Sequence, residues 1–302
     1  MDTILFHNPK AGEEDHAKKA LVALLEEAGL KIEVHGTKGQ ELKKGLKKQR
    51  ELVLIAGGDG TVGRICRNLT ERGRCCAVLP LGTANNLARA LGSWPSPEHF
   101  AAGWTKAAHR HLNVAMAEAE NEEREGFGER RFVESLGFGA FAQAIQDADE
   151  AGEEGVDAGR AVFRQTLSEA PVIHARLRID DQEHVVETLL VEVMNIALFG
   201  PNLPLAPDAR PGDGLLDVVL LPPQRREAML EWLHAPGSGA PPVETIRGSQ
   251  VTLYWPGGAI RVDDEPLEFN GACTITCKVE PAPLTFLVPR EALAAPKKGR
   301  PE

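Results

Sequence analysis

The sequence contains few aromatic residues and no long apolar run. Aromatic residues make up 5% of its 302 residues and include a single tyrosine, Tyr254, so we expect a core of mainly aliphatic side chains. No stretch of roughly eighteen apolar residues occurs, which excludes a membrane-spanning helix. The first residues show neither the basic start nor the cleavage pattern of a signal peptide. We therefore expect a cytoplasmic protein that reaches a membrane only transiently, from its surface.

The cysteines and histidines do not form a metal-binding pattern. The cysteines are odd in number and lack C-x-x-C spacing; they are Cys66, Cys75, Cys76, Cys273 and Cys277. His109 and His111 would lie on one face of a strand, but no third ligand accompanies them. We expect ordinary buried thiols rather than a zinc site.

Acidic residues exceed basic ones, but only in the second part of the chain. The net charge is −10, yet residues 1–110 carry 17 Lys and Arg against 12 Asp and Glu, and the remainder carries 17 against 32. The basic residues of the first part are either solvated helix faces or a positive surface for a nucleotide or an anionic bilayer. No aromatic residues interleave them, so we exclude nucleic acid as a partner.

Strands and helices alternate over the first hundred residues. The strands are expected at 4–7, 32–34, 52–56 and 77–79, and the helices at 15–28, 41–49, 61–69 and 84–91. The run 52–56 is apolar throughout, which is typical of a parallel strand buried on both faces. This alternation predicts an α/β nucleotide-binding domain with a parallel sheet over residues 1–110.

The pattern changes near residue 110. Short strand-like runs follow at 112–116, 131–134, 173–179, 185–193, 215–221, 251–254, 274–279 and 284–288. A helical stretch covers 140–165, interrupted by the acidic segment 147–159. We predict a β-rich domain over residues 111–290 that receives the substrate, and a disordered tail over 291–302.

The strongest chemical signal is Gly57-Gly58-Asp59-Gly60-Thr61, which lies between the buried strand and a helix. Glycines let the backbone approach a ligand closely, and the helix that follows points its first N–H groups at the loop. Such a loop suits phosphate, and Asp59 beside it suggests a bridging Mg²⁺ ion or a role at an acceptor hydroxyl. A plain strand–helix turn in which Asp59 caps the helix is the alternative.

A second loop, within residues 80–89, also lies between a strand and a helix. It contains Gly82 and the polar residues Thr83 and Asn85, which can bond phosphate or ribose or cap the helix. The carboxyl ends of parallel strands share one edge of a sheet, where such folds bind ligands. We therefore expect both loops at that edge. The G-x-x-x-x-G-K-[ST] motif is absent, which excludes a Walker-type ATPase, and the segment 137–142 lacks the βαβ context of a dinucleotide site.

Three segments carry a family resemblance. They are Asn8-Pro9-Lys10-Ala11-Gly12, the glycine-rich loop 57–61 and the loop 81–85, and in this order they resemble the diacylglycerol kinase catalytic-domain family. That family includes bacterial soluble lipid kinases, sphingosine kinases and ceramide kinases. Weaker similarity continues through 135–139, 211–218 and 262–267, so it covers nearly the whole chain.

The resemblance implies two domains, with ATP between them and its phosphates over the glycine-rich loop. The nucleotide-binding residues would be Asn8, Gly57, Gly58, Asp59, Gly60, Thr61, Gly82, Thr83 and Asn85. Asp59 would also handle Mg²⁺, and Asp263, beside Glu265, would be the general base at the lipid hydroxyl. Asp213 and Asp217 would hold a loop that carries a structural Mg²⁺ in bacterial relatives.

The resemblance thus predicts an ATP-dependent kinase that phosphorylates the hydroxyl of a membrane lipid such as diacylglycerol. The chain departs from the family at Asn86, where Asp is usual, at Arg64, where an acidic residue is common, and at Asp264, where Gly is usual. These departures leave open a nucleotide-binding regulator that has lost catalysis. An NAD kinase is a further alternative, and a homodimer also stays open.

Overall fold

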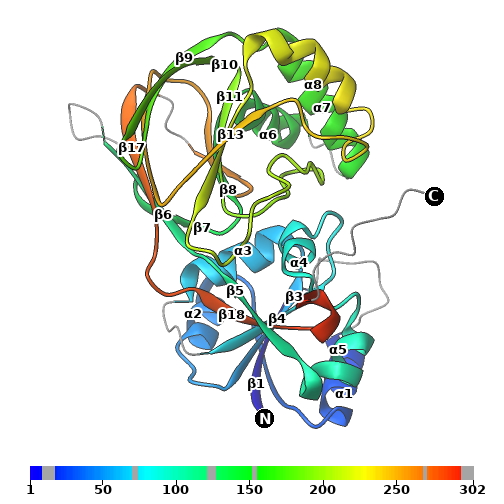
Figure 1. Cartoon of the computed structure of the whole chain (residues 1–302). Helices are drawn as coiled ribbons and strands as arrows, with labels where there is room; N and C mark the ends of the chain where they lie inside the picture. The colour runs from blue at the N-terminus through cyan, green and yellow to red at the C-terminus, as the bar shows by residue number, and fades with distance from the viewer. Residues whose placement is uncertain (9–17, 70–73, 121–126, 152–154, 268–270, 294–302) are drawn as a thin grey trace. The chain divides into compact units, whose positions relative to one another are not determined.

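The computed structural model describes residues 1–8, 18–69, 74–120, 127–151, 155–267 and 271–293 (Figure 1). The chain divides into two compact units. The first unit contains Met1–Leu112 and the segment that starts at Pro283; the second unit is Asn113–Ala282. The sequence-based boundaries were 110 and 290. The segment after residue 283 lies in the first unit because its strand pairs with that unit's sheet.

The first unit contains a sheet with the strand order β2-β1-β3-β4-β18-β5. All neighbouring strands are parallel except β18 and β5, which are antiparallel. The strands are β1 (Asp2–His7), β2 (Lys31–Gly36), β3 (Leu52–Gly57), β4 (Cys75–Pro80), β5 (Ala108–Leu112) and β18 (Leu284–Val288). The strand β3 is buried along its whole length, as its apolar run predicted. The expected α/β class of this part is confirmed.

Helices connect these strands and pack on the sheet (Figure 1). They are α1 (Lys18–Glu27), α2 (Gly39–Leu46), α3 (Asp59–Asn68), α4 (Asn86–Leu91), α5 (Pro97–Gly103), and the 3₁₀ turns η2 (Trp104–Lys106) and η4 (Arg290–Leu293). Leucines of α1 and Phe100 of α5 join the aliphatic side chains of the strands in one buried cluster. The turn η4 occupies the start of the segment that we expected to be disordered; residues 294–302 lie outside the described part.

The second unit contains two mainly antiparallel sheets, which confirms the predicted β-rich class. One has the order β10-β9-β14-β17-β6-β7, and the other β13-β12-β11-β8-β15-β16. The strands are β6 (Ala115–Glu120), β7 (Gly128–Phe132), β8 (Ser135–Gly139), β9 (Ile173–Ile179), β10 (Gln182–Thr188), β11 (Leu190–Met194), β12 (Leu216–Leu220), β13 (Glu244–Gly248), β14 (Gln250–Trp255), β15 (Ile260–Val262), β16 (Glu265–Pro266) and β17 (Cys273–Val279). One core cluster takes alternate residues from both sheets, such as Leu177 and Leu253 from one and Leu136 and Val191 from the other.

Helices cover the second of these sheets on its other face (Figure 1). They are α6 (Ala140–Ala151), α7 (Val156–Glu169), α8 (Arg226–Trp232) and the 3₁₀ turn η3 (Pro223–Arg225). Phe141 and Phe163 from α6 and α7 pack with Phe199, with ring centroids 4.6–5.8 Å apart. The residues of this sheet therefore face apolar surroundings on both sides.

Two predicted strands differ from the structure. The run 185–193 forms two strands, β10 and β11, because the chain passes from one sheet to the other at Thr188 and Leu189. The run 112–116 likewise divides between β5 and β6, which belong to different units. The break in the helical stretch is also shorter than predicted, since α6 extends to Ala151. In both strand runs the apolar pattern continues across a change of pairing partner.

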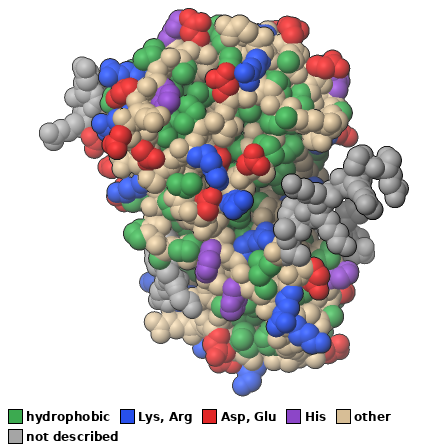
Figure 2. Space-filling model, in the orientation of Figure 1, with side chains coloured by type: hydrophobic (Ala, Val, Ile, Leu, Met, Phe, Trp, Pro, Cys, Tyr) green, Lys and Arg blue, Asp and Glu red, His purple; other side chains and the backbone are tan. Residues whose placement is uncertain are grey.

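Within the described residues, no helix combines the length and the apolar character that crossing a bilayer requires. On the face drawn in Figure 2, basic side chains lie among acidic and hydrophobic ones rather than in one continuous patch. On this face, therefore, the basic residues do not form the positive surface for a nucleotide or an anionic bilayer that was one of the two interpretations of the sequence.

Candidate active site

The glycine-rich loop connects β3 to α3 in the first unit. The strand ends at Gly57, Gly58 is the N-cap residue, and the helix starts at Asp59. The carbonyl oxygen of Gly58 accepts the N–H groups of Thr61 and Val62, both at 3.0 Å. The positive end of α3 is therefore at the carboxyl edge of the sheet, where the first amide groups of a helix favour an anion such as phosphate.

The second loop lies against the first one, backbone to backbone. The N–H of Leu81 donates to the carbonyl oxygen of Gly57 at 3.1 Å, which continues the β3–β4 pairing beyond the strands. A Cβ atom on Gly82 would lie 2.5 Å from the Cα of Gly58, and one on Gly58 would lie 3.1 Å from the Cα of Gly82. Only glycine permits this approach. The two loops thus meet at one edge of the sheet, as the strand order of the sequence led us to expect.

Polar side chains fasten the two loops. The Oδ1 atom of Asp59 accepts the N–H of Leu87 at 3.1 Å, so the first loop caps the helix that follows the second. Asn85 has a left-handed backbone with φ of 52°. Its Oδ1 accepts the N–H of Gly82 at 3.0 Å, and its Nδ2 donates to the carbonyl oxygen of Gly82 at 2.6 Å. Thr83, between them, is exposed. Asp59 and Asn85 therefore shape the loops, whatever they bind.

The end of β1 brings a third strand to this edge. The N–H of Asn8 donates to the carbonyl oxygen of Ala56 at 3.1 Å, and its Nδ2 donates to Oγ1 of the buried Thr61 at 3.1 Å. The predicted nucleotide residues of the first unit thus gather where three neighbouring strands end. The rest of the motif that begins at Asn8, Pro9-Lys10-Ala11-Gly12, lies outside the described residues.

In the second unit, Asp263 stands in the turn between β15 and β16. It has a positive φ of 51° and is 4% exposed. Its Oδ1 accepts the N–H groups of Val133, Glu134 and Ser135 at 3.1, 2.8 and 3.3 Å. Glu265 starts β16 and is exposed. The turn therefore presents one fixed carboxylate, followed by the exposed carboxylates of the next two residues.

Asp213 and Asp217 both contact Arg247. Nη2 of Arg247 lies 2.8 Å from Oδ2 of Asp213, and its Nε lies 3.0 Å from Oδ1 of Asp217. Burial raises the pKa of Asp217, and the Arg247 charge opposes that shift. Across the described residues, no group of three or more His, Cys, Asp and Glu side chains is arranged to hold a metal ion. The guanidinium thus supplies a positive charge where the sequence suggested Mg²⁺, and the metal role stays a prediction.

A buried ion pair that was not predicted from the sequence lies directly before the Asp263 turn. Arg261 donates to Glu192, and both residues are 0% exposed. Burial raises the pKa of Glu192 to about 7, against the opposing effect of Arg261. A signal was present: Glu192 is a charged residue inside the otherwise apolar stretch 189–194.

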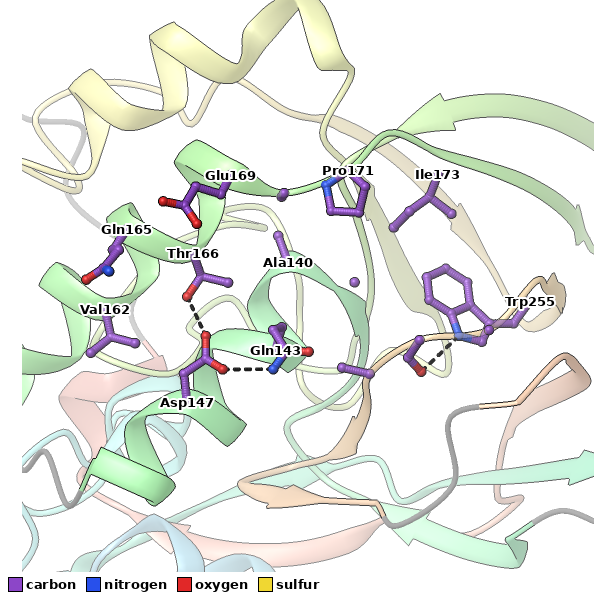
Figure 3. Close-up of a pocket in the computed structure, with 15 residues that line it drawn as sticks. Ala140, Gln143, Asp147, Val162, Gln165, Thr166, Glu169, Pro171, Ile173 and Trp255 are labelled. Carbon is purple, nitrogen blue, oxygen red and sulfur yellow. Dashed lines mark hydrogen bonds between the residues drawn. The ribbon is translucent and has the colours of Figure 1, made fainter.

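The second unit also contains a pocket of about 570 Å³ between α6, α7 and the β14–β15 turn (Figure 3). Pro171, Ile173 and Trp255 form an apolar side of it. On the helical side, Asp147 accepts hydrogen bonds from Gln143 at 2.8 Å and Thr166 at 2.9 Å. Its volume lies in the range of small-molecule sites, roughly 300–1,000 Å³.

Two family models match the chain. The model of the diacylglycerol kinase catalytic domain matches residues 2–117, and that of the YegS C-terminal NAD kinase beta sandwich-like domain matches residues 135–288. A Pseudomonas aeruginosa PAO1 protein named "Probable lipid kinase YegS-like" is 29% identical over 283 residues, which cover 88% of this chain and 87% of that protein. A diacylglycerol kinase of Mycobacterium tuberculosis H37Rv is 26% identical over 306 residues, which cover 94% of each.

Solved structures share the fold. A diacylglycerol kinase from Bacillus anthracis Sterne has a TM-score of 0.73 at 20% identity, covering 97% of this chain and 98% of that one. Yeast NADH kinase complexed with NADH has a TM-score of 0.61 at 9% identity, covering 96% and 84%. The matches place the chain among the lipid kinases. It belongs to the family in which a diacylglycerol kinase catalytic domain precedes a YegS-type C-terminal domain.

Proposed function

We propose that this lipid kinase family member transfers the γ-phosphoryl group of ATP to the hydroxyl of a membrane lipid such as diacylglycerol. The observation that carries the proposal is the contact of two glycine loops, Gly58 against Gly82, at the carboxyl edge of the first unit's sheet. Family membership supports the lipid kinase class. Our proposal adds to family membership the identity of the nucleotide, ATP, and of the acceptor, a membrane lipid such as diacylglycerol.

The residues at the sheet edge suit a nucleoside triphosphate. The loops offer backbone amides and two facing glycines, so that no Cβ atom obstructs the backbone. The residues that would hold ATP are Asn8, Gly57, Gly58, Asp59, Gly60, Thr61, Gly82, Thr83 and Asn85, and Asp59 would also hold Mg²⁺. ATP supplies the phosphoryl group when bound, and Mg²⁺ supplies positive charge for its phosphates. The chain's own contribution is to orient the phosphates with amide groups fixed before binding.

The Asp263 turn suits the acceptor side of the reaction. Asp263 would accept the proton of the lipid hydroxyl, with Glu265 beside it. Three amide N–H groups fix the orientation of the Asp263 carboxylate, which is what a general base requires. The pocket in the second unit would receive apolar parts of the lipid against Ile173 and Trp255.

The experiment incubates the purified protein with labelled ATP, Mg²⁺ and mixed micelles that contain diacylglycerol, ceramide or sphingosine, with NAD and NADH as further acceptors. We expect label in a lipid product. Label in NADP(H) alone would replace the proposal with an NAD kinase. Nucleotide binding without any labelled product would instead support a regulator, in line with Asn86 and Arg64 at family positions that are usually acidic.

Two asparagine variants test the acceptor turn. Asp263→Asn keeps the shape of the side chain and removes the basic oxygen, so we expect turnover to fall by about 100-fold or more. Asp264→Asn makes the same change at the next residue, which is exposed, and should leave turnover within about threefold. Retained turnover in folded Asp263→Asn, with loss in Glu265→Gln, would move the role of base to Glu265.

A further inference from the structure

Glu192 and Arg261 lie on two strands that flank the same residue of β8. Gly137 is paired with Glu192 of β11 on one side and with Arg261 of β15 on the other. The two charged side chains therefore meet across the central strand, where Nη2 of Arg261 donates to Oε2 of Glu192. Both are fully buried, so neither charge is solvated by bulk water.

Gly137 makes this meeting possible. A Cβ atom at Gly137 would lie 2.5 Å from Oε1 of Glu192 and 2.8 Å from Nε of Arg261, much closer than non-bonded atoms approach. A glycine inside a strand weakens the strand, and it often marks a place where another group must come close. Here the group that comes close is the ion pair.

Arg261 connects this pair to the turn that follows it. Its Nη1 donates to the carbonyl oxygen of Asp263, and its Nη2 donates to Oγ of Ser135 at 3.0 Å. The guanidinium also lies 3.9 Å from the centroid of the Phe199 ring. Asp263 also contacts the first residue of β8, because its N–H donates to the carbonyl oxygen of Ser135 at 2.8 Å. Arg261 and Asp263 thus hold the start of β8 from two sides.

The backbone of Asp263 needs such support. A positive φ of 51° is unfavourable for a residue with a Cβ atom, and strained backbones persist only where the surroundings fix them. The Arg261 bond to the carbonyl oxygen of Asp263 fixes the peptide group that follows the strained residue. The direction of the Asp263 carboxylate depends on this backbone.

Stability alone is a poor explanation for the pair. Removing two charges from water is unfavourable, and well-packed apolar residues are often at least as stabilising as a buried ion pair. Nε of Arg261 and Oε1 of Glu192 are moreover buried without a hydrogen-bond partner in the described structure. The pair is therefore better explained by what it orients.

We propose that Arg261 and Glu192 are positioning residues that hold the Asp263–Glu265 turn in its working conformation. Glu192 fixes the guanidinium, and the guanidinium fixes the carbonyl oxygen of Asp263 and the hydroxyl of Ser135. The inference rests on the proposed function, in which this turn supplies the general base. Neither residue contacts the reacting atoms in this account; both act through Asp263.

The test replaces the whole pair, since a single replacement would leave a buried charge unpaired and could prevent folding. Glu192→Leu with Arg261→Met keeps the bulk and removes both charges, so we expect a folded protein with a Tm at or above that of the wild type. We expect kcat for lipid phosphorylation to fall by about 100-fold, as for a misplaced catalytic group. The KM for ATP should stay unchanged, because the proposed nucleotide loops belong to the first unit.

A matched control is available on the surface of the same unit. Arg176 pairs with Glu183 at 3.1 Å and lies 5.1 Å from the centroid of the Tyr254 ring, which parallels Arg261, Glu192 and Phe199. Glu183→Leu with Arg176→Met should leave kcat within about threefold of wild type, because this pair is exposed. A stable Glu192→Leu/Arg261→Met protein with wild-type kcat would overturn the inference.

Hydrogen exchange separates this inference from the proposed function. If the wild type phosphorylates no lipid, the proposed function fails, but the conformation of the turn can still be measured. The amides of Val133, Glu134 and Ser135 report on it, because they donate to the Asp263 carboxylate. We expect these amides to exchange at least about tenfold faster in the double variant, while β3 amides of the first unit are unchanged. Unchanged exchange at residues 133–135 would refute the positioning role independently of any activity.

Discussion

The two groups of candidate site residues, the glycine loops of the first unit and the Asp263 turn of the second, are held in place by different kinds of contact. At the edge of the first unit, the loops lack side chains where they touch, and Gly58 meets Gly82 through backbone atoms alone. At the turn of the second unit, the chain buries charged side chains around Asp263 and holds them with directed hydrogen bonds. The first arrangement suits an anionic ligand that binds to amides, and the second suits a carboxylate whose direction matters. We therefore expect the glycine loops to be sensitive to added side-chain atoms, and the Asp263 turn to be sensitive to changes of charge.

The largest effect is expected for Gly82→Ala. The new Cβ would lie 2.5 Å from a backbone atom, the Cα of Gly58, which no side-chain rotation can relieve. The loops would have to separate, and we expect kcat/KM for ATP to fall by more than about 100-fold. The free energy of unfolding should fall by roughly 1–3 kcal/mol, as for other overpacked sites. Steady-state kinetics and urea unfolding measure the two effects.

Gly239→Ala provides the control for this comparison. Nothing lies within 4 Å of a Cβ atom at Gly239, and its φ is outside the left-handed region, so this variant should behave as wild type. If Gly82→Ala bound and used ATP as the wild type does, the contact of the two loops would have no bearing on the nucleotide.

The second prediction concerns the buried charge and gives a pH dependence. The folded-state pKa of Glu192 is about 7, above the ordinary value of 4.5, chiefly because of burial. Below pH 4.5 the carboxyl is protonated in both states. Between pH 4.5 and 7 the unfolded chain loses this proton and the folded one keeps it, so the free energy of unfolding falls as pH rises. We expect a loss of at most about 3 kcal/mol across this window, from 1.36 kcal/mol per pKa unit.

The Glu192→Leu/Arg261→Met protein isolates this contribution, because neither leucine nor methionine titrates and no buried charge is left unpaired. Urea unfolding at several values between pH 4.5 and 8 should show the wild type losing stability relative to the variant as pH rises to 7, and a constant difference above it. If the wild type kept a constant stability relative to the variant between pH 4.5 and 7, or gained stability relative to it, the folded-state pKa of Glu192 would not lie above its ordinary value.

The arrangement of the glycine loops was easier to predict from the sequence than that of the Asp263 turn, for a physical reason. The glycine loops are contiguous segments between a strand and a helix, so the periodicity places them and the strand order brings them to one edge. Asp263, in contrast, is held by amides at 133–135 and by a pair whose members are 69 residues apart. Such contacts depend on which strands become neighbours.

Local pattern also concealed the burial of Arg261. Ile260, Arg261 and Val262 alternate apolar and charged, which is typical of a strand with one exposed face. Helices cover that face in the structure, and a charged residue is buried there. The strand at 284–288 was predicted correctly from its apolar run, but its pairing with β4 of the first unit could not be predicted from that run. Periodicity finds elements, and it does not assign their neighbours.

The third prediction tests the polar contact that ties β1 to the glycine-rich loop. Thr61→Val keeps the shape of a 5% exposed side chain and removes the hydroxyl that accepts from Asn8. We expect a loss of about 1 kcal/mol in the free energy of unfolding and an increase of about fivefold in the KM for ATP. Thr61→Ser restores the hydroxyl and should recover most of the KM. If Thr61→Ser is as impaired as Thr61→Val, packing rather than the hydrogen bond is responsible.

The smallest effect is expected for Asp213→Asn, which asks whether Arg247 or Mg²⁺ balances the two carboxylates near it. The Asp213 side chain is 24% exposed, and Arg247 already contacts it at 2.8 Å, so its loss should cost at most about 1 kcal/mol. Asp217 is 3% exposed and keeps its own contact to Arg247 at 3.0 Å in this variant. If the arginine is the counter-ion, millimolar Mg²⁺ will shift the Tm of the wild type and of Asp213→Asn equally. If the carboxylates hold Mg²⁺, the ion will raise the Tm of the wild type but not that of Asp213→Asn. Arg247→Met will then gain more than the wild type, because removing the guanidinium leaves two carboxylates for the metal.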